Sequence, residues 1–138
     1  QGESGFRKLK REEVVKLGCQ CCPDSEFERT VLLCKYLIHV ILLDDLISMG
    51  IMGEYFDTLL NFENDLSKVM EMMDAAVNFP QDPITASFVD IWQQMKQLMN
   101  IKWQKRFAES FIWYVKCNGW EVENRKYKRV PQLGEYLT

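Results

Sequence analysis

Hydrophobic residues recur along this chain at helical spacing, and no stretch of any length alternates between apolar and polar positions. Spacings of three and four residues indicate amphipathic helices, whereas strict alternation indicates strands. No internal repeat is visible. The pattern therefore predicts an all-α protein, a helical bundle without a sheet. The predicted helices span about residues 11–18, 25–48, 54–63, 65–77, 84–99 and 100–127, and one more starts at 133–137.

Helix-breaking residues set the predicted boundaries. We expect Gly18 to end the first helix, and the Pro-Asp-Ser segment at 23–25 to supply a break and the start of the second. Gly50 interrupts the chain just after that second helix. Asn100 is expected to open the last long helix, and the Val-Pro pair at 130–131 to follow its end.

The most apolar stretch of the chain ends in two adjacent carboxylates. From Tyr36 to Ile47 the residues read YLIHVILLDDLI, with only His39, Asp44 and Asp45 polar. A helical run that is apolar on every side is a buried element, and two ionised aspartates at its end repel each other unless a cation joins them. Hard oxygen ligands suit Mg²⁺, so the pair is a candidate magnesium site. The alternative is that both side chains simply reach water where the helix leaves the core.

Composition describes one compact globular domain. The chain has 138 residues, enough for a sizeable core, and 47% of them are hydrophobic against 27% charged. The net charge is −3, so no long basic face for nucleic acid is expected. The longest apolar run is too short to cross a bilayer, so we expect a soluble protein without a membrane span.

The cysteines indicate a cellular setting. The five cysteines, at positions 19, 21, 22, 34 and 117, form no recognisable zinc or disulfide framework, and His39 is the only histidine. An odd count without a signal peptide favours a reducing environment, so we expect a cytoplasmic protein. Because the chain begins Gln1-Gly2 rather than with Met, we also expect a processed or trimmed start.

Three strings in the second half of the chain carry a family resemblance. They read PITASFVDIW, KWQKRFAES and GWEVENRKYKRVPQLGEYL. Upstream, the Pro-Asp pair at 23–24 leads into the long apolar helix that ends in Asp44 and Asp45, which is the order of the same family. From about Arg11 onward the chain resembles a microbial-type class I terpene synthase. The ending RVPxLxEYL is the most specific part of this resemblance.

The resemblance implies a mechanism and a cofactor. Such enzymes bind a prenyl diphosphate, here farnesyl or geranyl diphosphate, with three Mg²⁺ ions inside a helical bundle, ionise it, and cyclise it in an apolar pocket. On this resemblance Asp44 is the main metal ligand and Asp45 supports it. Helical spacing places Leu37, Val40 and Ile41 one and two turns before Asp44 on roughly the same face, so they are candidate pocket residues. They are equally well explained as ordinary core aliphatics.

Two departures from the family pattern bear on activity. The third acidic residue expected after Asp44 is absent, because Ile47 and Ser48 stand at those positions. The family's diphosphate-sensing Arg and its Asn/Ser/Glu metal motif would lie beyond Thr138. We therefore expect residues 1–138 to be a single α-helical domain that is incomplete at the C-terminus, and also at the N-terminus. Alone it should be inactive and should self-associate through its uncovered apolar face.

Three interpretations follow from the sequence. The first is part of a terpene synthase, and the second is a non-catalytic helical domain of terpene-synthase type that binds a partner or itself. The third, a prenyl-chain-elongating synthase, is disfavoured because only one Asp-Asp motif occurs. Glu121, Asn124 and Arg125 lie in a segment that the family shares, and they form either a buried polar network or a ligand site.

Overall fold

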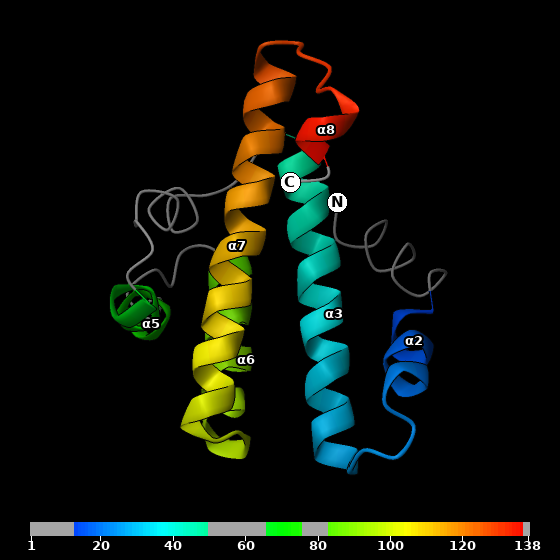
Figure 1. The fold of residues 1–138 in the computed structure, drawn as a ribbon. Coiled ribbons are helices and arrows are strands. Elements are labelled where there is room, and N and C mark those ends of the chain that lie inside the picture. The colour runs from blue at the N-terminus through cyan, green and yellow to red at the C-terminus, as the bar shows by residue number, and fades with distance from the viewer. Residues whose placement is uncertain (1–12, 50–65, 76–82, 137–138) are drawn as a thin grey trace.

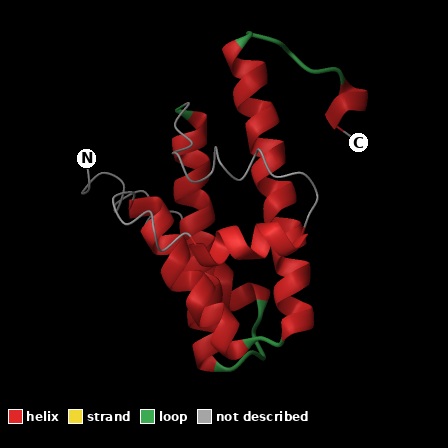
Figure 2. Cartoon of the chain, turned by 90° about the vertical axis from the view of Figure 1, so that its left-hand side faces the viewer, coloured by secondary structure: helices red, strands yellow, loops and turns green. Residues whose placement is uncertain are grey.

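The computed structural model describes residues 13–49, 66–75 and 83–136, and every regular element in these parts is a helix (Figures 1 and 2). The predicted all-α fold is therefore confirmed. No helix within those ranges is long and apolar enough to span a bilayer. The helix predicted at 54–63 and the break predicted at Gly50 lie outside the described residues. The helices are α2 (Val14–Cys21), α3 (Phe27–Ser48), α5 (Leu66–Ala75), α6 (Pro83–Leu98), α7 (Ile101–Lys126) and α8 (Leu133–Tyr136).

The two longest helices, α3 and α7, lie side by side and run in the same direction (Figure 1). Two contacts define their register. The ring centroids of Tyr36 and Phe107 are 5.3 Å apart, and near the far ends Arg125 Nη1 donates a hydrogen bond of 2.8 Å to the carbonyl of Ser48. This register places the end of α3, which carries Asp44, beside the second half of α7.

The core forms where α3, α5, α6 and α7 meet, and aromatic rings fill its centre. Phe88 of α6 stacks on Phe111 of α7 with 4.5 Å between the ring centroids. Trp92 is fully buried, and its indole N–H donates to Asp74 Oδ1 at 2.7 Å, so its polar edge is satisfied. Aromatic side chains bury large apolar areas, so this cluster stabilises the described bundle.

Gly18 does not end its helix, contrary to the prediction. Helix α2 continues through Gly18 to Cys21 and packs against α3. Gly18 is buried there, and a Cβ atom at this position would lie 2.5 Å from Cys34 Sγ. The glycine is needed for the close approach of two helices rather than for a turn, which the local sequence pattern does not reveal.

The start of α7 agrees with the prediction. Asn100 is the N-cap, and its side-chain oxygen accepts a hydrogen bond of 3.0 Å from the backbone N–H of Trp103. The start of α3 differs slightly, because Glu26 rather than Ser25 is its N-cap. The Glu26 side chain makes no capping hydrogen bond, and the Thr30 hydroxyl donates to the Glu26 carbonyl at 3.2 Å. Helix α8 confirms the helix start predicted at Leu133.

Candidate functional site

The predicted metal ligands lie near the C-terminal end of α3. Asp44 is exposed and Asp45 is half-buried. Within the described residues, the Asp44 carboxylate takes part in no hydrogen bond or ion pair. Its oxygens are therefore available to a cation, as a magnesium ligand requires.

The described part of the chain does not by itself contain a complete metal cage. In these ranges no three His, Cys, Asp or Glu side chains lie close enough together to hold an ion. Mg²⁺ is commonly bound by one or two carboxylates, with water and substrate phosphates completing the coordination sphere. The adjacent carboxylates of Asp44 and Asp45 fit a magnesium ion bound in that way.

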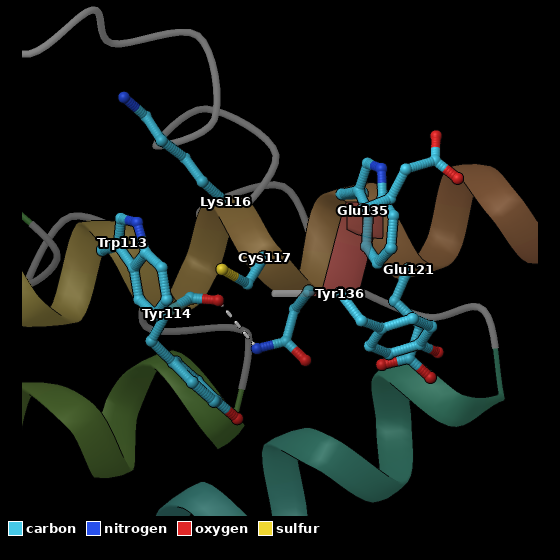
Figure 3. Close-up of a pocket in the computed structure, with 9 residues that line it drawn as sticks. Trp113, Tyr114, Lys116, Cys117, Glu121, Glu135 and Tyr136 are labelled. Atoms are coloured by element: carbon cyan, nitrogen blue, oxygen red, sulfur yellow. Dashed lines mark hydrogen bonds between the residues drawn. The ribbon is translucent and has the colours of Figure 1, made fainter. Parts of the chain in front are cut away.

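Tyr114 of α7 lies near Asp44. Burial, and then the negative charge of Asp44, raise the pKa of the Tyr114 phenol, so this group is neutral at physiological pH. Its hydroxyl is shielded from solvent and has no hydrogen-bond partner among the described residues. One turn further along α7, the buried Asn118 donates to the backbone carbonyl of Tyr114 at 2.9 Å (Figure 3). The site thus contains a phenol donor beside the candidate metal ligand.

Tyr36 lies two turns before Asp44 on α3. Burial, and then the nearby Tyr114, raise the pKa of Tyr36 to about 12. Its ring packs edge-on against Phe107 at 5.3 Å. Tyr36, Tyr114 and Asp44 therefore follow one another along the α3–α7 interface, from the aromatic core to the exposed carboxylate.

A cavity of about 540 Å³ opens beside this interface, between the second half of α7 and α8 (Figure 3). Aromatic rings form much of its wall, and Trp120 meets Tyr136 edge-on with 5.5 Å between the ring centroids. The pocket residues predicted from the sequence, Leu37, Val40 and Ile41, do not include this aromatic wall. The closely spaced aromatic residues of α7 were the available signal. The lining residues are Trp113, Tyr114, Lys116, Cys117, Asn118, Trp120, Glu121, Glu135 and Tyr136.

The predicted pocket residues Leu37, Val40 and Ile41 lie on α3 and are each half-buried. None of them belongs to the buried core cluster of the described residues. They are also not among the side chains that line the cavity between α7 and α8. Their role as pocket residues stays a prediction.

A polar network occupies the end of α7, beside the last turn of α3. Arg125 pairs with Glu121 one turn earlier and also donates to the carbonyl of Ser48. The neighbouring Asn124 is buried, and its Oδ1 accepts a hydrogen bond of 2.7 Å from Arg129 Nε. The side-chain contacts of this segment therefore fit the polar network that was one of its two predicted roles. Of Glu121, Asn124 and Arg125, only Asn124 is buried.

Comparison with known proteins supports one family. A family model described as "Terpene synthase family 2, C-terminal metal binding" matches residues 35–138. The chain is 26% identical over 132 residues to (+)-eremophilene synthase of Sorangium cellulosum, covering 94% of this chain and 39% of the relative. It is 24% identical to germacrene A synthase of Nostoc punctiforme, covering 98% and 41%. It is also 24% identical to bonnadiene synthase of Allokutzneria albata, covering 99% and 39%.

The chain thus spans about two-fifths of the length of these curated relatives. No solved structure matches it. The family-model match includes Asp44, Asp45 and all of α6, α7 and α8.

Proposed function

Because this chain belongs to the terpene synthase family, we propose that it is the part of a class I terpene synthase that carries the first metal-binding aspartates. The whole protein would convert a prenyl diphosphate, such as farnesyl or geranyl diphosphate, to a terpene in a Mg²⁺-dependent reaction. The observation that carries the proposal is the exposed carboxylate of Asp44, which is unpaired among the described residues. It lies at the end of the apolar run of α3, inside the segment that matches a metal-binding domain.

Asp44 and Asp45 are the residues that would hold Mg²⁺. A bound magnesium ion would neutralise the charge that develops on a leaving diphosphate. Asp44 can turn toward such an ion without breaking an interaction with another described residue. Asp45 would add a second carboxylate from the next position of α3.

The apolar surroundings of the aspartates suit the second half of the reaction. Leu37, Val40 and Ile41 present half-buried aliphatic surface on the turns before Asp44, and such surface keeps water away from a reactive hydrocarbon. Aromatic faces stabilise a nearby positive charge by about 0.5–2 kcal/mol each. Trp113 and Trp120 would play that role only for a cation bound in the α7–α8 cavity, which the three α3 side chains do not line.

The test uses the whole protein that carries this chain, with farnesyl and geranyl diphosphate supplied separately. Products are identified by gas chromatography and mass spectrometry, in Mg²⁺ and again after chelation. We expect a hydrocarbon or terpene alcohol from one of the two substrates, and none after chelation. A properly folded protein that gives no product from either substrate, or the same product without divalent metal, would overturn the proposal.

A further inference from the structure

Two consecutive side chains near the end of α7, Asn124 and Arg125, contact two different elements. Arg125 reaches back to the last turn of α3, whereas Asn124 holds the chain that follows α7. The two residues thus join parts that are far apart in sequence.

Arg125 caps the end of the aspartate-bearing helix. The last carbonyls of a helix lack partners within it and carry the negative end of the helix dipole, so a cation stabilises them. Arg125 Nη1 donates to the Ser48 carbonyl at 2.8 Å, and Glu121, one turn earlier on α7, pairs with Nη2 of the same guanidinium. Ser48 lies one turn after Asp44, so the capped turn is the one that carries both aspartates.

Asn124 anchors the segment between α7 and α8. Its backbone carbonyl accepts from the backbone N–H of Arg129 at 2.8 Å, and its Oδ1 accepts from Arg129 Nε at 2.7 Å. Arg129 Nη1 then donates to Glu135 at 2.8 Å, and Glu135 accepts a second bond of 2.7 Å from the backbone N–H of Gln132. The backbone N–H of Gln132, and then Arg129, lower the pKa of Glu135, so this carboxylate stays ionised.

We propose that Asn124 and Arg125 are positioning residues that couple the aspartate-bearing end of α3 to α8. The guanidiniums of Arg125 and Arg129 each already bind a carboxylate and an oxygen atom of a second residue. These partners argue against a role for either arginine as a free anion ligand. A metal site needs its ligands held within about 0.5 Å of the working geometry, and a fraying helix end does not provide that. The metal-related part of this inference rests on the proposed function, whereas the coupling itself does not.

Hydrogen exchange of the full chain tests the coupling. Arg125→Met should speed the exchange of backbone amides in the last turn of α3 by roughly threefold. The decisive variant is Arg129→Met, because none of the hydrogen bonds and ion pairs that Arg129 makes with described residues involves α3. It should speed exchange at 127–136 and also in the last turn of α3. Arg106→Met is the matched control, because Arg106 is exposed on the same helix and has no partner among the described residues.

If Arg129→Met changes exchange only at 127–136, the two sides of the network are independent and the coupling is wrong. A second readout uses the whole protein. Arg125→Met and Arg129→Met should each raise the Mg²⁺ concentration for half-maximal turnover several-fold, and Arg129→Lys should restore part of the loss. An unchanged Mg²⁺ dependence would overturn the positioning role. If the whole protein lacks prenyl diphosphate turnover, the proposed function fails, while the exchange data still decide the coupling.

Discussion

Tyr36 of α3 and Tyr114 of α7 lie close together across the interface that leads to Asp44. Burial, and then the neighbouring Tyr114, raise the pKa of Tyr36 to about 12. Tyr114 itself is neutral for related reasons, namely burial and then the charge of Asp44. Two uncharged phenols therefore lie along the α3–α7 interface that leads to the candidate metal site.

The raised pKa of Tyr36 predicts a loss of stability in alkali. An unfolded tyrosine ionises near pH 10, whereas folded Tyr36 ionises at about 12. The contribution of neutral Tyr36 is complete below pH 10 and is lost as the pH rises through 12. Its loss lowers the free energy of unfolding by about 3 kcal/mol. Urea unfolding at several pH values measures it. Tyr36→Phe keeps the ring contact with Phe107 and should lack the fall in the free energy of unfolding between pH 10 and 12. If the free energy of unfolding fell equally steeply with pH in both proteins, the assignment to Tyr36 would be wrong.

Gly18→Ala should destabilise the chain by about 1–3 kcal/mol, because the added methyl group would overlap Cys34 Sγ. Thermal unfolding followed by circular dichroism measures the loss. Gly134→Ala is the matched control, since a Cβ there would meet nothing within 4 Å, and it should change stability by less than about 1 kcal/mol. Adding Cys34→Ala to Gly18→Ala should recover much of the loss. Equal effects of the two glycine substitutions would show that α2 does not pack as described.

A larger side chain at Ile41 should change the product mixture of the whole protein. Ile41→Phe places a ring on the half-buried face one turn before Asp44, where we expect it to reshape the pocket rather than unfold the bundle. Gas chromatography of the products detects the change, with circular dichroism as the folding check. Val31→Phe, at an exposed position of the same helix, is the control and should leave the mixture unchanged. An unaltered profile in folded Ile41→Phe would assign Ile41 to ordinary packing.

The isolated chain should self-associate and should not convert prenyl diphosphates. Large apolar side chains around the α7–α8 cavity are exposed, with Trp113 at 65%, Leu133 at 75% and Tyr136 at 67%. Soluble monomers rarely expose large contiguous apolar patches, so these side chains and the half-buried α3 residues favour association. Light scattering should detect dimers or larger species, and a product assay should find no turnover. A monomer that cyclises farnesyl diphosphate would disprove both expectations.

Most helices could be predicted from the sequence because their signals are local. The periodic apolar spacing of α6 and the capping side chain of Asn100 act within one or two turns. Gly18 was misinterpreted because its role depends on Cys34, which lies in another helix. The neighbouring sequence looks the same whether a glycine ends a helix or allows a second helix to pack closely against it.

In the candidate site, too, local features could be predicted from the sequence and contacts between distant residues could not. The aspartate pair stands out in the sequence because charge interrupts a long apolar run. The cavity between α7 and α8 is not visible in the sequence, because Tyr136 reaches Trp120 only when the chain folds back after α7. The Arg129–Glu135 ion pair holds that fold. Asn124 and Arg125 could be singled out by their motif, but only their contacts distinguish a positioning network from a ligand site.

Turnover by Asp44→Asn in the whole protein tests most directly whether Asp44 binds the catalytic magnesium. The amide keeps the size of the side chain and removes its charge, and Asp24→Asn, at an exposed position before α3, is the matched control. With prenyl diphosphate and Mg²⁺ we expect Asp44→Asn to lower turnover at least about 100-fold, with helix content unchanged. Asp24→Asn should behave as the unmodified protein. Near-normal turnover by Asp44→Asn, with the same dependence on Mg²⁺, would contradict the account.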